Sequence, residues 1–320
     1  MSAIESFGAY VPRYRIDASE FEAAWGTFEA RGVVEKVVPA SDEDAVTMAV
    51  EAIERALAKS KTTRGDVEAL ALGTTTAPVD EGDVTAQVAE IVGLNRSVEL
   101  TAHTQSTRAG TEALRVAAES GDFPSVAVAA DCPLGAPDDA VDHAAGAGAV
   151  ALLINEDGPV SIEESASYAQ EFPGTRFRQR GRTNVESYDA TAFGRDAYTS
   201  VVAGAVDALE RPGSGLAPTA PDGSMPYRAG GAVDTDYDVY ERASSLGDTG
   251  AASAFFGMLA AWENGEDDIV LAGYGDGASA DAIRLAGSID VDWDQETVSI
   301  RYDEYLRKRG HIVSNDGDMN

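Results

Sequence analysis

The hydrophobic pattern alternates between helix-like and strand-like segments, and this order occurs twice along the chain. Residues 45–57 place apolar side chains at helical spacing after Ser41-Asp42-Glu43-Asp44, which predicts a helix capped by Ser41 with Asp44 near its positive end. Residues 67–72 form a short apolar run typical of a buried strand. Residues 195–209 predict a second helix, and residues 217–223 predict a weakly formed second strand.

A second repeat is more explicit. Residues 104–135 and 245–278 each contain a Ser/Thr-bearing turn, an Ala-rich helix, a polar break, a short apolar strand and a loop with Gly and Asp. The polar breaks are residues 119–122 and 263–266. Two copies of one helix–strand order predict a duplicated α/β fold around a pseudo-twofold axis. The repeat also places a helix N-terminus at Gln105-Ser106-Thr107, where a nucleophile could be activated, although that turn has no cysteine.

These repeats define the expected domain organisation. We expect an N-terminal half over residues 1–160 and a linking excursion over a cleft at residues 161–194. A C-terminal half should follow at 195–300, and then a tail at 301–320 that is disordered at its end. Residues 4–15 predict a strand leading into a Pro-containing turn, and residues 297–301 predict a separate strand in the tail region.

The charge is strongly acidic, with 55 acidic residues against 24 basic ones and a formal net charge of −31. Only four of the bases are lysines: Lys36, Lys59, Lys61 and Lys308. An acidic, lysine-poor surface is typical of proteins that stay soluble in concentrated salt, so the composition predicts a halophilic habitat. It argues against nucleic-acid and anionic-membrane partners, which need clustered positive charge. The first 15 residues have no secretory pattern and no apolar run approaches ~20 residues, so we expect a soluble cytoplasmic protein.

Cysteine and histidine usage limits the chemistry further. The single cysteine, Cys132, excludes an internal disulfide and a cysteine-based metal site, and the three histidines lack zinc-ligand spacing. We therefore expect no metal. Cys132 follows the apolar run at 126–130, where a small buried residue is a better interpretation than a displaced nucleophile.

Seven segments together resemble the archaeal hydroxymethylglutaryl-CoA synthases of the thiolase superfamily. They are residues 7–15, 39–45, 109–111 (Ala-Gly-Thr), 135–140, 247–249, 273–278 and 305–310, in the same order as in that family. The resemblance implies an α/β thiolase fold, with two pseudo-symmetric βαβαβ-type halves in a layered αβαβα arrangement.

The resemblance also implies four catalytic positions, and all four are changed here. The family's nucleophilic cysteine precedes Ala-Gly-Thr by two residues, where this chain has Thr107. The histidine of the His-Gln-Pro-Asn-Gly motif falls at Thr219, the asparagine of Gly-Asn at Asp248, and the acid/base glutamate at Thr75. A cysteine thiolate is accessible near neutral pH, whereas a threonine hydroxyl needs a strong adjacent base. These positions predict that condensing activity has been lost. His103 precedes the turn, and we expect it to be structural.

Two features suggest a ligand. Arg176, Arg178, Arg180 and Arg182 alternate, so an extended segment would direct all four to one side, where they could bind the phosphates of coenzyme A. Salt bridges to the acidic surface are the alternative. The loop at 273–277 contains Gly275 and Gly277, which the family resemblance places at the site, although a tight turn explains them equally well. We expect no covalently bound cofactor, with CoA or acyl-CoA as the candidate ligand.

Three functions remain open from the sequence. The first is a subunit that binds acyl-CoA or acts as a scaffold. It would form a homodimer and assemble, as archaeal relatives do, with an acetoacetyl-CoA thiolase and a bridging zinc-ribbon/OB-fold protein. The second is an active acyltransferase of the hydroxymethylglutaryl-CoA synthase or ketoacyl synthase type, which would use Ser106, Thr107 or Asp248. The third is a structural homodimer with a closed cleft. Whether the chain is an enzyme is therefore left open.

Overall fold

The computed structural model describes residues 2–172, 176–187, 191–292 and 296–312, and the tail end predicted to be disordered falls outside them. Its centre is a ten-stranded sheet in the order β12-β11-β13-β14-β8-β1-β7-β6-β4-β5. The first-half strands are β1 (Ser2–Tyr10), β4 (Ala69–Gly73), β5 (Glu99–His103), β6 (Ser125–Asp131) and β7 (Gly148–Asn155). The second-half strands are β8 (Val160–Ala169), β11 (Gly215–Pro218), β12 (Asp238–Val239), β13 (Asp268–Gly275) and β14 (Ser279–Ala286).

The sheet confirms the predicted duplication. In the first half β4 is parallel to β5 and β6, while β7 is antiparallel to β6 and β1. In the second half β11 is parallel to β12 and β13, while β14 is antiparallel to β13 and β8. The two halves join where β1 pairs with β8 in antiparallel fashion, with Ser2 opposite Ile162 and Ile4 opposite Val160. The pseudo-twofold axis therefore passes between β1 and β8.

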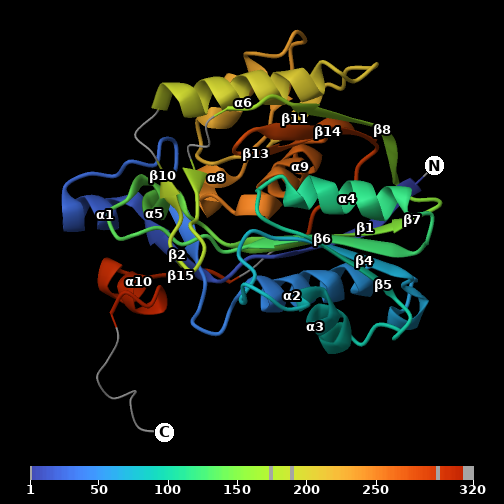
Figure 1. The fold of residues 1–320 in the computed structure, drawn as a ribbon, viewed down its shortest axis with the longest axis horizontal. Coiled ribbons are helices and arrows are strands. Elements are labelled where there is room, and N and C mark those ends of the chain that lie inside the picture. The colour runs from blue at the N-terminus through green and yellow to red at the C-terminus, as the bar shows by residue number, and fades with distance from the viewer. Residues whose placement is uncertain (1, 173–175, 188–190, 293–295, 313–320) are drawn as a thin grey trace, which may run out of the picture.

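Helices divide the structure into the expected layers (Figure 1). The helices α2 (Ala45–Ala58) and α3 (Val84–Val92) cover the outer face of the first half, and α6 (Thr191–Val206) covers that of the second, beside α7 (Met225–Gly230). Between the two parts of the sheet lie the equivalent helices α4 (Ala109–Glu119) and α9 (Ser253–Glu263). Helix α4 contacts β4 and β6 of its own half and β13 and β14 of the other. This is the αβαβα arrangement that the resemblance implied.

The start of α2 differs from the prediction in its capping residue. Asp44, not Ser41, is the N-cap: its carboxylate accepts from Thr47 N at 2.8 Å, and Thr47 Oγ1 accepts from Asp44 N at 2.8 Å. Ser41 is too far upstream because the chain first makes a turn, in which Glu43 accepts from Ala40 N at 2.6 Å. Asp44 immediately precedes the first buried helical residue, as an N-cap does.

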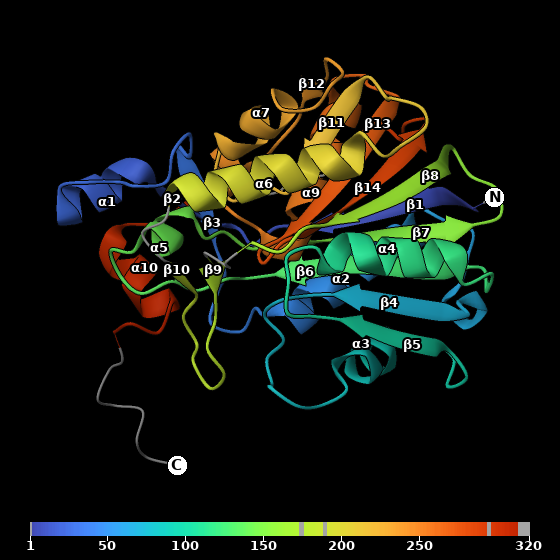
Figure 2. The same cartoon turned by 45° about the horizontal axis from the view of Figure 1, so that its top comes forward.

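Two predicted boundaries are wrong. The strand expected at 217–223 is β11, and it ends at Pro218 because Asp222 accepts from Ser224 N and Met225 N and so starts α7. The excursion expected at 161–194 is also too long. Residues 160–169 form β8, whose alternating burial made it look like a polar loop, and α6 already begins at Thr191. What remains of the excursion contains a short hairpin of β9 (Arg176–Phe177) and β10 (Glu186–Ser187), which lies near the end of β6 (Figure 2).

A smaller lobe lies at the same end of the molecule (Figure 1). Its three-stranded sheet has the order β15-β2-β3, and the strand predicted at 297–301 is only the two-residue β15. Tyr305 of the last helix is buried here. No helix within the described ranges is long and apolar enough to cross a membrane. The remaining elements are β2 (Tyr14–Asp17), β3 (Glu35–Val38), β15 (Val298–Ser299), α1 (Ala18–Trp25), α5 (Ala140–Ala144), α8 (Ala243–Leu246), α10 (Tyr302–Lys308), and the 3-10 turns η1 (Arg64–Asp66) and η2 (Gly250–Ala252).

Candidate active site

Thr107 lies in the turn that leads into α4, and its hydroxyl is engaged by the main chain. Its Oγ1 donates to the carbonyl oxygen of Tyr274 at 2.6 Å. The hydroxyl of Thr219, at the end of β11, accepts from the backbone N–H of Tyr274 at 2.9 Å. One residue of β13 therefore binds both threonines. The structure brings the two predicted positions together, but each hydroxyl is held by backbone.

Thr75 is bound to a buried carboxylate that the sequence analysis did not single out. Asp131 ends β6 with no exposed surface, and its oxygens accept from the hydroxyls of Thr74, Thr75 and Thr76 at 2.9, 2.8 and 2.7 Å. They also accept from the backbone N–H groups of Thr75, Thr76 and Ala251 at 2.7, 2.9 and 2.7 Å. Burial raises the pKa of Asp131 in spite of these donors. Asp131 thus fixes the turn after β4 and ties it to η2 of the other half.

The approach of η2 to Asp131 requires glycine. Gly250 has φ of +55°, and a Cβ on it would lie 2.2 Å from Asp131 Oδ2. Glycine is therefore needed at this position both for its conformation and for the close contact.

Asp248 is paired with an arginine from the hairpin. Its side chain is nearly buried, Oδ1 accepts from Gly250 N at 2.8 Å, and Oδ2 forms an ion pair with the guanidinium of Arg176. A buried carboxylate without a partner would be strongly unfavourable. Arg176 therefore compensates for the charge that Asp248 introduces where the resemblance expects asparagine.

A cavity of about 710 Å³ connects the hairpin to the turns that carry Thr75 and Thr107. Thr219 and Asp248 are buried and are not among its lining residues, so only two of the four predicted catalytic positions face this space. Thr74, Ser106, Phe177 and Asp276 also line it. The site therefore consists of an open part beside Thr75 and Thr107 and a buried part beside Asp248.

All four predicted arginines line this cavity, but they do not form a row on one side. β9 covers only Arg176 and Phe177, and a turn follows in which Arg182 N donates to Gln179 O at 3.0 Å. Arg176 reaches inward to Asp248, and Arg178 donates to the carbonyl of Thr75. Arg180 and Arg182 are exposed, so the period-two prediction was wrong in geometry because the segment turns.

Neither Gly275 nor Gly277 lines the cavity. Gly275 ends β13, where a Cβ would lie 2.0 Å from Ser106 Oγ, so its lack of a side chain lets the turn before α4 pack against the strand. Gly277 lies in the turn from β13 to β14 with φ of +127°. Close packing at 275 and the positive φ at 277 thus explain why both positions are glycine. Asp276, between them, lines the cavity.

His103 and Cys132 lie outside the cavity lining. His103 is half-buried on β5, and desolvation lowers its pKa. Cys132 follows β6, where burial raises the pKa of its thiol. Within the described ranges, no group of histidine, cysteine and acidic side chains could hold a metal ion.

Known proteins resemble the chain over almost its full length. It is 30% identical to the hydroxymethylglutaryl-CoA synthase of Pyrobaculum aerophilum, with 97% of each chain covered. The chain belongs to the hydroxymethylglutaryl-CoA synthase family. A second synthase of this family, from Methanopyrus kandleri, is 28% identical over 97% of this chain and 94% of its own length. No family model matches the sequence.

Solved structures of hydroxymethylglutaryl-CoA synthases have the same fold. A synthase complexed with CoA gives a TM-score of 0.85 at 14% identity, covering 100% of this chain and 93% of its own. MvaS in complex with 3-hydroxy-3-methylglutaryl coenzyme A gives 0.78 at 18% identity, covering 96% and 91%. At these identities the likeness concerns the fold.

Behind the site of this synthase-family chain lies a buried lysine that the sequence analysis missed. Lys36 is 1% exposed, and its Nζ donates to Asp142 O and to the hydroxyl of Tyr305, the latter at 3.1 Å. The rings of Phe21 and Tyr305 lie 4.7 and 4.6 Å from Nζ. Burial lowers the pKa of Lys36 to about 7. A Cβ on Gly247 would lie 3.0 Å from Lys36 Cβ, so the lysine supports the turn that carries Asp248.

Proposed function

We propose that this chain is a member of the hydroxymethylglutaryl-CoA synthase family that binds acyl-CoA but does not carry out the condensation. The observation that carries this proposal is the hydrogen bond from Thr107 Oγ1 to the carbonyl oxygen of Tyr274. A nucleophilic hydroxyl must give its proton to a base, and a peptide carbonyl cannot take one at neutral pH. The residue at the histidine position, Thr219, has its hydroxyl bound by a backbone N–H.

The cavity supports binding of a CoA thioester. Arg180 and Arg182 are exposed on its wall, and no carboxylate in the described ranges lies within ion-pair distance of either. Guanidinium groups bind phosphate oxygens in a bidentate manner, so these two arginines would hold the phosphates of CoA. Two structural neighbours were solved with CoA or an acyl-CoA. Thr75 and Thr107 line the same space and would contact the acyl end.

We also propose that the chain works as a scaffold subunit, as a homodimer in an assembly with an acetoacetyl-CoA thiolase and a zinc-ribbon/OB-fold protein. Support for a protein partner comes from a structural neighbour, the curacin-pathway HMG synthase, solved with an acyl carrier protein (TM-score 0.79, 17% identity). The two partners named here rest on the family resemblance alone. The C-terminal helix does not add to this support. Tyr305 is buried inside the chain, and Arg309 binds the carbonyl of Pro133, so these two contacts are internal.

Binding is tested by calorimetry with CoA and acetyl-CoA. The double variant Arg180→Ala/Arg182→Ala should bind CoA at least about tenfold more weakly, equivalent to ~1.4 kcal/mol. Arg96→Ala removes an exposed arginine elsewhere and should leave binding unchanged. Absence of saturable CoA binding by the unmodified chain at millimolar concentration would overturn the proposal.

The absence of acyl transfer to the chain is tested by incubation with radiolabelled acetyl-CoA. We expect no covalent label on the chain. Label that is retained on the unmodified protein and lost in Thr107→Ala would instead establish the alternative, an active acyltransferase with an atypical nucleophile. Affinity purification from the native host tests the assembly, and recovery of the chain alone would count against it.

A further inference from the structure

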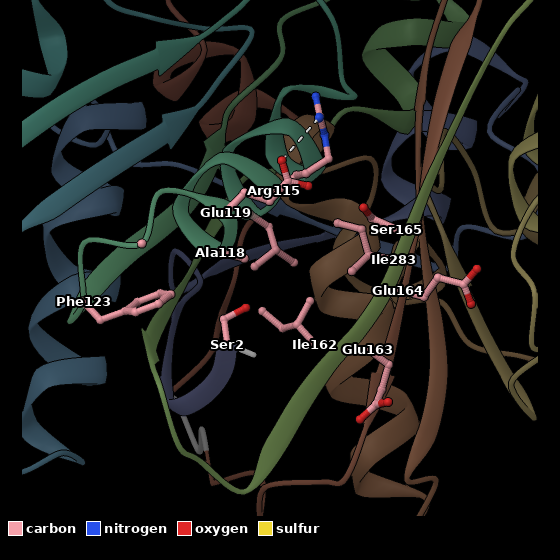
Figure 3. Close-up of a pocket in the computed structure, with 12 residues that line it drawn as sticks. Ser2, Arg115, Ala118, Glu119, Phe123, Ile162, Glu163, Glu164, Ser165 and Ile283 are labelled. Atoms are coloured by element: carbon pink, nitrogen blue, oxygen red, sulfur yellow. Dashed lines mark ion pairs between the residues drawn. The ribbon is translucent and has the colours of Figure 1, made fainter.

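A second cavity lies at the far end of α4, near the N-terminus of the chain (Figure 3). Its volume is about 380 Å³, and we call it the Ala118 pocket. The side chains of Ala118, Ile162 and Ile283 face one space in Figure 3, with Phe123 at one side. Thr107 lies in the turn before α4, and Ala118 is nine helical positions after Ala109, so the pocket lies roughly 14 Å along the helix from the candidate active site. It shares no lining residue with the candidate active-site cavity, so its occupant is independent of the proposed function.

The pseudo-twofold axis shows what occupies the symmetry-related place. The antiparallel pairing of β1 with β8 relates Ile4 to Ile162, because Ile4 faces Val160 as Ser2 faces Ile162. Each strand then has a register shift, at Glu5 in β1 and at Glu163 in β8. Beyond these shifts, Phe7 is equivalent to Ser165. Their cross-strand neighbours agree, since Phe7 pairs with Leu152 and Ser165 with Ile283.

The central helices α4 and α9 are related by the same axis. The polar breaks after α4 and α9 align Glu119 with Glu263, and therefore Ala118 with Trp262. The ring of Trp262 packs against the ring of Phe7, with centroids 5.7 Å apart. At the equivalent place the Ala118 pocket has alanine and serine. The pocket is thus the space that an aromatic pair fills at the symmetry-related place, where β1 meets the end of α9.

We propose that the Ala118 pocket binds a small planar aromatic molecule, which takes the place of the Phe7–Trp262 pair. Its walls combine the buried apolar side chains of Leu114 and Ile283 with polar residues at the rim, such as Glu163 and Glu164. An apolar cavity of about 150 Å³ is already enough to hold benzene. The volume of the Ala118 pocket therefore admits a fused two-ring compound.

The edge of the pocket favours an aromatic ring over an aliphatic one. Arg115 forms an ion pair with Glu119 there, with 3.8 Å between the charged atoms. Its buried Nε has no hydrogen-bond partner within the part of the chain that the structure describes. A guanidinium is attracted to the face of an aromatic ring, so a planar ligand would cover this group.

The experiment uses indole as the aromatic probe and cyclohexanol as a non-planar comparison, with binding followed by ligand-observed NMR titration of the full chain. Indole should bind saturably, and cyclohexanol at least about fivefold more weakly. Ala118→Trp fills the pocket with the residue of the other half, so it should weaken indole binding at least about tenfold. Ala58→Trp, at an exposed helix end, is the matched control and should change binding less than about twofold.

The result that would overturn the inference is indole binding that survives in folded Ala118→Trp. Equal binding of cyclohexanol would overturn the aromatic class. If Ala118→Trp does not fold, Ser165→Phe closes the pocket from the strand side, and unchanged indole binding in that variant rejects the site. Displacement of indole by CoA would show that the probe sits in the other cavity, which also rejects it. Failure of CoA binding leaves this test unaffected, so the two proposals are separable.

Discussion

Helices α4 and α9 occupy equivalent places in the two halves, but their surroundings differ. Every residue from Ser253 to Trp262 of α9 is buried. Helix α4 instead starts at the candidate active-site cavity and ends at the Ala118 pocket. The duplication therefore preserves the backbone, while side-chain size decides whether each end of a central helix is closed or open.

The ends of β6 and β13 are also equivalent in backbone and different in side chain, and each packs against a turn of the other half. The β6–β7 and β13–β14 pairings make Asp131 equivalent to Gly275. Asp131 lies against Gly250 in the turn before α9, and Gly275 lies against Ser106 in the turn before α4. Each strand end meets the turn of the other half, and one member of each pair is glycine. Asp131 therefore reaches the Thr75 turn with its side chain, whereas the end of β13 offers Thr107 a backbone carbonyl.

The largest expected effect concerns the closed end of α9. Trp262→Ala should lower the free energy of unfolding by about 3–5 kcal/mol, because it removes a buried aromatic side chain and leaves a cavity. The equivalent change at the open end of α4, Ala118→Gly, should cost only about 1 kcal/mol through helix propensity. Urea denaturation of both variants measures the difference, and equal losses would contradict the comparison.

The next effect concerns the strand ends. Asp131→Ala should cost about 3 kcal/mol or more, since hydrogen bonds to a charged group contribute about 1.5–3 kcal/mol each and several buried donors lose their acceptor. Asp131→Asn keeps one acceptor oxygen and should cost less. Thermal unfolding of both variants tests this order, and the reverse order would show that the carboxylate is not the organising group.

Lys36, which lies beside the turn that carries Asp248, should make the free energy of unfolding depend on pH. Its pKa is lowered to about 7 in the folded chain and is near 10.4 when unfolded, so between these values the unfolded state binds more protons. Its contribution therefore rises as the pH increases from about 7 toward 10, by up to ~1.4 kcal/mol per pH unit, and is lost as the pH falls through 7. Lys36→Met should remove this slope. Urea denaturation at pH 7, 8 and 9 gives the difference, and parallel slopes would rule out the lysine as its source.

The smallest effect is expected at Gly275, the glycine of β13 that packs against the turn of the other half. Gly275→Ala places a Cβ against Ser106 Oγ, the end of a small side chain that can rotate, so we expect a loss of about 1 kcal/mol. Gly250→Ala meets the buried Asp131 at a positive φ and should cost more, about 1–3 kcal/mol. A thermal shift that is larger for Gly275→Ala would contradict this ranking.

The fold was largely predictable because periodicity and repetition are local signals. The helix at 45–57 and the strands at 67–72 and 126–130 are present as α2, β4 and β6. Strand β8 was missed because only one of its faces packs inward, so its sequence is as polar as a loop. Alternating burial in a polar segment is weak evidence without its partner strands.

The site was predictable only where a motif marks it. Thr75 and Thr107 follow from their neighbouring family residues, and the structure places both on one cavity. The pairing of Asp248 with Arg176 joins residues far apart in sequence and has no local signal. Asp131 is a single acid at the end of an apolar run, and Lys36 stands beside Glu35 as a surface residue would. Only the fold shows that each is buried among hydrogen-bond partners.

The central pairing of β1 has a consequence for how the chain is made. Tyr10 pairs with Ala149 and Ala3 with Asn155, so β1 waits during synthesis for partners that are made much later. At typical elongation rates of about 5–20 residues per second, that delay is roughly 7–30 s. During this time an apolar strand lacks both of its neighbours and is open to pairing with other nascent chains. The seam that unites the two halves is therefore also the step at which biosynthesis is most exposed to misassembly.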